Sequence, residues 1–160
     1  MSASLANGSP GIRLREATLA DLDTIMHLER ATFPTDAWSR DVMAAELASP
    51  HTVYLVAESG DDVVAYAGLS AVPRADQADL QTIAVDPTHR RLGVGTVLVQ
   101  HLLALARERG AREMLLEVRA DNPGAEALYE RHGFTRIAVR PRYYQPDDVD
   151  AIVMRAELIP

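Results

Sequence analysis

The sequence contains no cysteine, and aromatic residues make up only 5% of its 160 residues. The absence of cysteine excludes disulfide bonds, thiolate catalysis and zinc sites built on cysteine ligands. No apolar run approaches the roughly 20 residues that a membrane-spanning helix needs. The first ten residues, MSASLANGSP, have neither a basic segment nor an apolar core. We therefore expect no secretory signal there, a disordered tail over residues 1–10, and a cytoplasmic protein without membrane contacts.

Basic residues are in the minority, because 16 Lys and Arg stand against 23 Asp and Glu for a net charge of −7. A basic surface supplies most of the affinity for nucleic acid, so we expect no direct nucleic-acid binding. This charge would suit a basic peptide or protein partner. With 48% hydrophobic residues, the chain has an ordinary globular composition. We expect one domain over residues 11–160, as a monomer or weak dimer.

Hydrophobic periodicity and turn signals predict strands and helices in an irregular order. The predicted strands cover residues 12–17, 53–58, 63–72, 80–85, 113–119, 134–140 and 151–157. The predicted helices cover residues 19–32, 40–48, 93–109 and 124–132. This order predicts a mixed α/β domain and not a simple alternation of strands and helices.

The stretch HRRLGVGT, residues 89–96, begins a predicted helix with cations and glycines. A helix N-terminus disfavours each cation by roughly 0.3–1 kcal/mol, and a glycine inside the first turn costs about 1 kcal/mol. Free backbone N–H groups, two arginines and a close approach would suit a polyanion, most simply a pyrophosphate. The alternative is a connector whose arginines face solvent. The Walker lysine and the third glycine of a dinucleotide fingerprint are both missing.

The letters RRLGVG, residues 90–95, fit the [RQ]-x-x-G-x-[GA] motif of the GCN5-related N-acetyltransferase (GNAT) family, which the chain resembles from Ile12 to Leu158. The resemblance implies a GNAT-type α/β domain, with a mixed, mostly antiparallel, twisted sheet of about seven strands and about four helices. It implies acetyl-coenzyme A (acetyl-CoA) as co-substrate and no metal. The implied contacts are the backbone of Ile83, Ala84 and Val85 with the pantetheine arm and the thioester, and Arg90, Arg91, Leu92, Gly93, Val94, Gly95 and Thr96 with the pyrophosphate.

The stretches LLEVRADNPGAEALYERHGF, residues 115–134, and RPRYYQPDDVDAIVM, residues 140–154, resemble the RimI-type ribosomal-protein-alanine N-acetyltransferases of that family. This resemblance implies that Glu117 is the general base, Tyr129 the general acid, and Asn122 a ligand of the pantetheine arm. It also implies direct acetyl transfer, in a ternary complex, to the N-terminal alanine of a small-subunit ribosomal protein.

Several alternatives stay open at this point. Glu117 could be a solvated strand carboxylate, and Tyr129 could simply pack in the core. The same scaffold could acetylate lysines or small amines, or bind acetyl-CoA without catalysis. The segment FPTDAWS, residues 33–39, is longer than the F-P-W-S typical of the RimI type, which leaves the acceptor open. By analogy this segment, Tyr143, Tyr144 and residues 147–150 border the peptide site.

Overall fold

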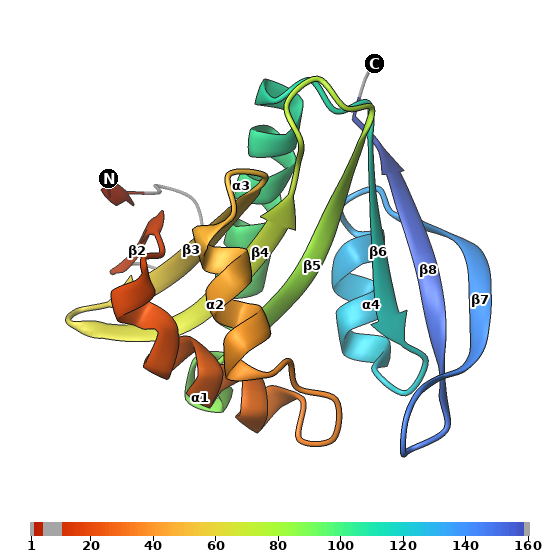
Figure 1. Cartoon of the computed structure of the whole chain (residues 1–160), viewed down its shortest axis with the longest axis horizontal. Coiled ribbons are helices and arrows are strands. Elements are labelled where there is room, and N and C mark those ends of the chain that lie inside the picture. Colours follow the sequence, from red (N-terminus) through yellow and green to blue (C-terminus); the bar gives the residue numbers. More distant parts are fainter. Residues whose placement is uncertain (1, 5–10, 159–160) are drawn as a thin grey trace.

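A twisted sheet forms the centre of the computed structural model, which describes residues 2–4 and 11–158 (Figure 1). Neighbouring strands lie in the order β1-β2-β3-β4-β5-β6-β8-β7, and every pair is antiparallel except β5 with β6. In chain order the strands are β1 (Ser2–Ser4), β2 (Ile12–Glu16), β3 (Thr52–Ser59), β4 (Asp62–Ser70), β5 (Gln77–Val85), β6 (Glu113–Arg119), β7 (Thr135–Tyr144) and β8 (Val149–Glu157).

The parallel pair β5 and β6 separates soon after it begins. Pairing covers only residues 77–79 of β5 and 113–115 of β6, whereas β6 stays paired with β8 along its whole length. The register between β4 and β5 shifts where Leu80 and Thr82 pair with successive residues of β4, which leaves Gln81 as an extra residue. Such a bulge bends a strand and increases its twist. Residues 80–85 of β5 therefore have an edge without a strand partner on the β6 side.

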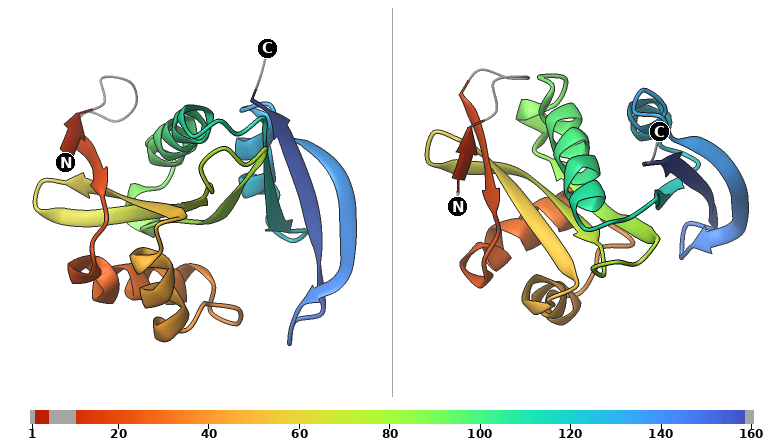
Figure 2. Two further views of the ribbon diagram at one scale, coloured as in Figure 1. Left: turned by 45° about the horizontal axis from the view of Figure 1, so that its top comes forward. Right: turned by 90° about the horizontal axis from the view of Figure 1, so that it is seen from above.

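Helices cover both faces of the sheet (Figure 2). Helices α1 (Leu22–Thr32) and α2 (Arg40–Ala48) lie on one face, and α3 (Val94–Glu108) and α4 (Pro123–Glu130) lie on the other. The larger hydrophobic core packs the apolar stripe of α3 against the sheet, and a second core lies under α1 and α2. Among the described residues, no helix is long and apolar enough to cross a membrane.

The sequence predicted the kind and approximate position of the four helices and of β2 to β8, and β5 begins at Gln77, three residues before the expected start. Asn122 caps α4, with its Oδ1 3.1 Å from the backbone nitrogen of Ala125, and Pro123 takes the first helical position. Three differences have local causes. The helix expected from residue 19 begins as a 3-10 turn, η1 (Leu19–Asp21), because Thr18 and Asp21 form a capping box. Strand β7 continues past residue 140, because Tyr144 still pairs with Val149.

The third difference is a short 3-10 turn, η2 (Pro87–His89), between β5 and α3. It begins where the side chain of Asp86 accepts a hydrogen bond from the backbone of Thr88. Residues 2–4 form β1, within the segment expected to be a disordered tail. The rest of that expectation falls on residues 1 and 5–10, outside those described, and the boundary of the domain at residue 11 stays a prediction.

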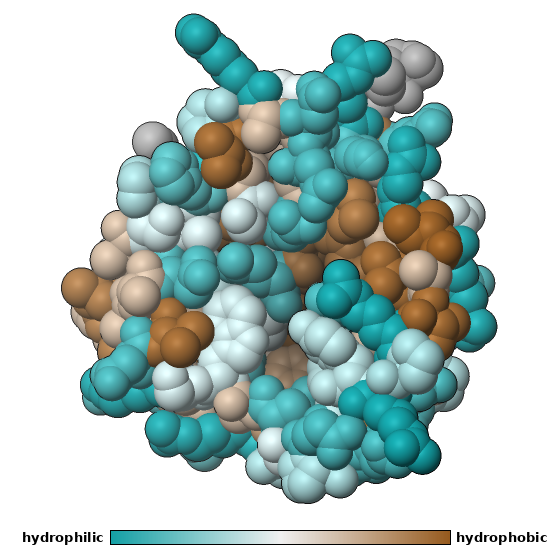
Figure 3. Space-filling view, turned by 45° about the vertical axis from the view of Figure 1, so that its right-hand side comes forward, coloured by the Kyte–Doolittle hydropathy of each residue, from teal (hydrophilic) through white to brown (hydrophobic). Residues whose placement is uncertain are grey.

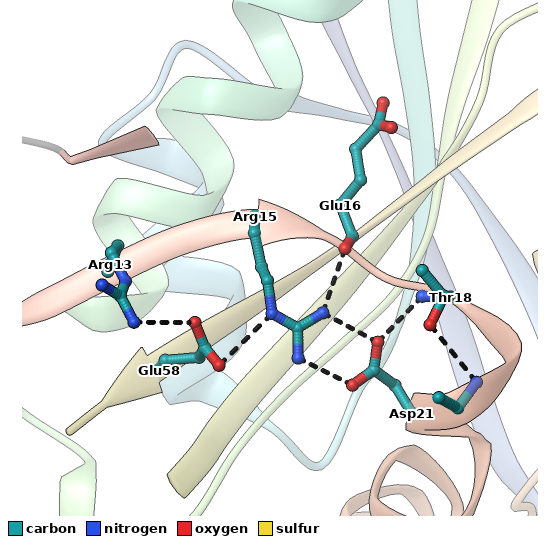
Figure 4. Close-up of polar contacts among 7 residues, drawn as sticks. Arg13, Arg15, Glu16, Thr18, Asp21 and Glu58 are labelled. Atoms are coloured by element: carbon teal, nitrogen blue, oxygen red, sulfur yellow. Dashed lines mark hydrogen bonds and ion pairs between the residues drawn. The ribbon is translucent and has the colours of Figure 1, made fainter. Parts of the chain in front are cut away.

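An ion-pair cluster fixes the start of η1 to β2 (Figure 4). The guanidinium of Arg15 donates two hydrogen bonds to the carboxylate of Asp21, at 2.8 and 2.9 Å. The same carboxylate accepts the backbone N–H of Thr18 at 2.8 Å. Glu58 lies on the other side of Arg15, at 3.3 Å from its Nε. These hydrogen bonds, chiefly that from Arg15, hold the pKa of Asp21 below its ordinary value.

Asp21→Asn is expected to lower the free energy of unfolding by about 2 kcal/mol, because it weakens a charged hydrogen-bond pair and a helix cap together. The folded-state pKa of Asp21 lies below the unfolded-state value of about 3.9. The stabilisation is therefore complete above about pH 4 and is lost as the pH falls through the folded-state pKa. Urea denaturation at pH 7 and pH 3 measures both effects.

The control variant is Asp23→Asn, which removes the ion pair of Asp23 with Arg40. Both of these side chains are more than half exposed. Exposed pairs contribute at most about 1 kcal/mol. Equal losses of stability in the two variants at pH 7 would contradict the role assigned to Asp21.

Candidate active site

A cleft of about 760 Å³ opens where β5 and β6 separate, and the space-filling view shows a recess on this side of the molecule (Figure 3). Its walls come from the end of α1 and the segment that follows it, from β5, β6 and α4, from the second half of β7, and from the middle of β8. Two of the predicted cofactor-binding residues, Ile83 and Asn122, line the cleft, and so do the predicted catalytic residues Glu117 and Tyr129. The structure thus brings together residues that lie far apart in the sequence.

The glycine–arginine turn lies beyond the cleft lining, after the carboxyl end of β5. Gly93 is the N-cap of α3 at φ 84°, a left-handed conformation, and gives the helix no side-chain cap. The first three residues of the helix, Val94, Gly95 and Thr96, have no acceptor for their N–H groups within the helix. Neither Arg90 nor Arg91 forms an ion pair with any residue in the described ranges.

Arg90 nevertheless has a structural contact, since its Nε donates to the backbone carbonyl of Val85 at 3.1 Å. This bond ties the turn to the end of β5 and engages one of the carbonyls expected to face the pantetheine arm. Gly95 also has a packing role, because a Cβ there would lie 3.3 Å from Cδ2 of Leu128 on α4. The close approach that the sequence predicted at Gly95 is therefore to a neighbouring helix in this structure.

The side-chain oxygen and nitrogen of Asn122 have different roles. Its Oδ1 caps α4, so the amide nitrogen keeps two N–H donors at the edge of the cleft. Among the described residues, none accepts a hydrogen bond from that nitrogen. Together with the open edge of β5, this donor fits an extended amide-bearing chain such as a pantetheine arm.

Glu117 lies on β6 with its side chain 33% exposed, and Nε of Arg140 contacts its Oε2 at 2.9 Å. Arg140 in turn lies over the ring of Tyr143, 5.5 Å from its centroid. The carboxylate is therefore in the cleft and held in place, and it is not simply solvated.

Tyr129 on α4 is only 4% exposed and packs edge-on against Phe134, with ring centroids 5.8 Å apart. It belongs to the larger core and lines the cleft as well. No described residue forms a hydrogen bond with its hydroxyl. Burial raises the pKa of Tyr129 above its ordinary value, so the phenol stays protonated. A buried hydroxyl without a protein partner is suited to meet a ligand.

Besides Asp79, sequence reasoning missed three charged residues of the cleft lining that have partners in the structure. They are Arg140, which pairs with Glu117, Arg119, which pairs with Asp36, and Glu29. Arg140 and Arg119 belong to the two stretches that carry the RimI-type resemblance, so the motif letters were the available signal. Glu29 lies on α1 and is 1% exposed, and its carboxylate accepts the backbone N–H of Trp38 at 2.9 Å.

The buried carboxylate of Glu29 is further satisfied by hydroxyl groups. Tyr66 donates to it, and Thr82 contacts the same oxygen at 3.2 Å. No periodicity of α1 distinguishes such a residue from a solvated glutamate, because its partners come from β4 and β5. Acidic residues outnumber basic ones in the described cleft lining, with Glu29, Asp36, Asp79 and Glu117 against Arg119 and Arg140.

Comparison with known protein families identifies the fold and its chemistry. Residues 22–134 match the model of the Acetyltransferase (GNAT) family. The chain belongs to the GNAT acetyltransferase family.

Three known proteins are similar to this acetyltransferase in sequence or in structure. It is 40% identical over 143 residues to N-alpha-acetyltransferase RimI of Mycobacterium tuberculosis, covering 88% of this chain and 89% of that protein. It is 41% identical to the uncharacterized protein ML0378 of Mycobacterium leprae, but spans only 39% of that protein's length. The crystal structure of the ribosomal-protein-S18-alanine N-acetyltransferase from Escherichia coli superposes with a TM-score of 0.83 at 31% identity, over 93% of this chain and 95% of that one.

These findings confirm the predicted fold and family, and with them an acetyl-CoA-dependent N-acetyltransferase. The free N–H groups of α3, the open edge of β5 and the unpartnered phenol of Tyr129 fit acetyl-CoA as the acetyl donor. In the described part of the chain, no group of three or more His, Cys, Asp or Glu side chains is placed to hold a metal ion.

Gly93→Ala is expected to raise the Kd of the acetyltransferase for acetyl-CoA by roughly tenfold. A left-handed conformation costs a residue with a Cβ about 1–2 kcal/mol, so the turn would shift and move the N–H groups at the start of α3. Isothermal titration calorimetry measures the affinity. The matched control is Gly110→Ala, at φ 92° after the other end of the same helix. Both variants should lose stability, and an unchanged Kd in Gly93→Ala would remove this turn from the cofactor site.

Proposed function

We propose that this acetyltransferase moves the acetyl group from acetyl-CoA to the α-amine of a protein N-terminus. The inferred substrate is an N-terminal alanine of a small-subunit ribosomal protein. The observation that carries the proposal is the presence of Glu117 and the unpartnered hydroxyl of Tyr129 in one cleft beside the open edge of β5. The similarity to N-alpha-acetyltransferase RimI of Mycobacterium tuberculosis and to the ribosomal-protein-S18-alanine N-acetyltransferase of Escherichia coli supports the same acceptor class.

The residues of the cleft divide the proposed reaction between them. Glu117 accepts a proton from the acceptor amine, directly or through water, so that the nitrogen can form its bond to the acetyl carbon. As the bond from that carbon to sulfur breaks, Tyr129 donates to the departing thiolate. No covalent enzyme intermediate is required, and the transfer takes place in a ternary complex. The residues 83–85, 90–96 and Asn122 are the proposed contacts of the coenzyme.

An α-amine is the easier acceptor for a single carboxylate base. Its pKa is near ~8, whereas that of lysine is near ~10.4, so close to pH 7 roughly a tenth of α-amines but under a thousandth of lysine side chains are neutral. The excess of acidic side chains in the described cleft lining also favours an acceptor that arrives as a cation.

The deciding experiment offers acetyl-CoA and two peptides to the enzyme and locates the acetyl group by mass spectrometry. One peptide begins with a free alanine and contains no lysine, and the other is N-terminally blocked and contains internal lysines. The enzyme itself contains no lysine, so any acetyl-lysine must come from the substrate. We expect labelling of the free α-amine alone. Labelling of lysine instead would overturn the proposed acceptor, and binding of acetyl-CoA without any labelling would favour a non-catalytic module.

The cytoplasmic location, the absence of nucleic-acid binding and the monomeric or weakly dimeric state remain predictions. Light scattering after size-exclusion chromatography tests the last of these.

A further inference from the structure

Two loops border the cleft at the end away from the glycine–arginine turn. One is the segment Phe33–Ser39, between α1 and α2, and the other is the turn between β7 and β8 (Figure 1). Phe33 and Trp38 line the cleft from the first loop. Tyr143 and Tyr144 line it from the end of β7. The cleft therefore has two aromatic walls, one on the first loop and one at the end of β7, where the second loop begins.

Side chains join the two loops directly. The hydroxyl of Thr35 in the first loop donates to the carboxylate of Asp147 in the second. Arg119, at the end of β6, contacts both sides, with 3.0 Å to Asp147 and 3.5 Å to Asp36. We call Thr35, Asp36, Arg119 and Asp147 the Arg119 bridge.

Contacts with several neighbours hold the guanidinium of Arg119 in a fixed position. The side chain of Arg119 is only 16% exposed, and its Nε also contacts Asp121 at 2.9 Å. Its guanidinium lies 5.2 Å from the ring centroid of Tyr144, so the bridge touches one aromatic wall directly. A planar guanidinium with five fixed donors can serve several carboxylates at once, which a lysine cannot do with the same geometry.

The residues that reach across come from the extra length of the first loop. The F-P-W-S pattern, to which this segment is similar, lacks the three residues between Pro34 and Trp38 in FPTDAWS. Two of those three, Thr35 and Asp36, form the contacts of the bridge on this side. The other end of the loop is anchored to α1, because the backbone N–H of Trp38 donates to the buried carboxylate of Glu29.

We propose that the Arg119 bridge determines acceptor specificity by fixing the distance between the two aromatic walls, and so the space for the acceptor's first side chain. The inference rests on the proposed N-terminal acetylation. Thr35, Asp36, Arg119 and Asp147 are positioning residues, since they act through Phe33, Trp38, Tyr143 and Tyr144. With the bridge intact the space admits alanine, and without it the loops separate and admit larger first residues.

The test compares the wild type with the double variant Thr35→Val/Asp36→Asn, which removes the hydroxyl donor of Thr35 and the negative charge of Asp36 while keeping side-chain size. Thr35→Ser keeps the hydroxyl and serves as the conservative variant. Asp23→Asn, which removes an exposed ion pair of α1 outside the cleft lining, is the matched control. Circular dichroism and acetyl-CoA affinity should be unchanged in all three.

Two measurements are made on each protein. The first is the ratio of kcat/KM for two peptides that differ only in a first residue of alanine or leucine. A pocket contact discriminates between such side chains by 10-fold or more, so we expect the ratio to fall by roughly fivefold in the double variant alone. Loss of active enzyme would scale both substrates equally and leave the ratio unchanged.

The second readout is collisional quenching of Trp38, the single tryptophan of the chain, by acrylamide. Quenching should increase in the double variant and not in Thr35→Ser or Asp23→Asn. Unchanged quenching would overturn the bridge as a positioning device, with or without turnover. Increased quenching with an unchanged ratio would overturn its role in specificity. A wild type that acetylates neither peptide would overturn the proposed function and this specificity with it, while quenching would still report the bridge.

Discussion

Glu117→Gln is expected to lower kcat for an alanine peptide at pH 7 by roughly 100-fold or more, while the affinity for acetyl-CoA stays within about twofold. A positioned general base contributes typically 10²–10⁴-fold. The amide of glutamine is similar in shape and can keep a hydrogen bond to Arg140, but it accepts no proton from the ammonium group of the acceptor. Steady-state rates and calorimetric titration with acetyl-CoA separate the two effects.

The pH dependence of the rate is a second test of Glu117 as the general base. The acceptor amine has a pKa near ~8, so it loses its proton unaided as the pH rises through that value. The deficit of Glu117→Gln should therefore narrow above about pH 8. The matched control is Glu113→Gln, four residues earlier on β6, whose carboxylate pairs with Arg155 at 3.1 Å and does not line the described cleft. Equal rates in Glu117→Gln and the wild type across this range would show that another group accepts the proton.

Tyr129→Phe is expected to lower kcat by about 10- to 100-fold, because it removes the donor to the departing thiolate. A hydrogen bond to a charged group contributes about 1.5–3 kcal/mol, and each 1.36 kcal/mol is a factor of ten in rate. Burial raises the pKa of Tyr129 above its ordinary value. A thiol has a pKa near ~8.5, so complete proton transfer is uphill and the hydrogen bond to the developing charge supplies most of the effect.

The stability of Tyr129→Phe distinguishes this role from a packing role. Its hydroxyl has no hydrogen-bond partner among the described residues, so the phenylalanine variant should unfold at an equal or slightly higher temperature. The control is Tyr54→Phe, which removes a hydroxyl that donates to Gln81 at 2.8 Å. That variant should lose stability and keep its kcat. A Tyr129→Phe variant that is destabilised but fully active would show that Tyr129 is only a core residue.

The elements of this fold could be predicted from the sequence because each depends on local periodicity and local capping. The apolar residues of α3 recur at helical spacing, and the helix buries Val94, Val97, Leu98 and Leu102 along this stripe while Leu105 is only partly buried. The turn at residues 59–62 joins β3 to β4, with Ser59 paired to Asp62. Strand β1 gives no such signal, since its three residues are too few for a period of two to be recognised.

The candidate site could be predicted where motif letters carry it. The letters RRLGVG indicated the turn before α3, and the letters around Glu117 and Tyr129 indicated the residues that we propose as base and acid. Whether Glu117 faced a cleft or solvent depended on the separation of β5 from β6, which follows from a bulge at Gln81. No pattern within a single strand reports such a separation.

By itself, therefore, the sequence determined the order and kind of the elements, the family, and the residues expected to hold the coenzyme. Only the tertiary structure decided which charges meet across the cleft: Arg140 with Glu117, Glu29 with the backbone of Trp38, and Arg119 with Asp36 and Asp147. The physical reason is the separation along the chain between the residues that interact. Helical and strand periodicity and capping act over a few residues, whereas these contacts join residues from 9 to 83 positions apart in the chain. The ion pairs of Arg119 and Arg140 form only once the folded sheet has brought β6 close to β7 and to the two loops.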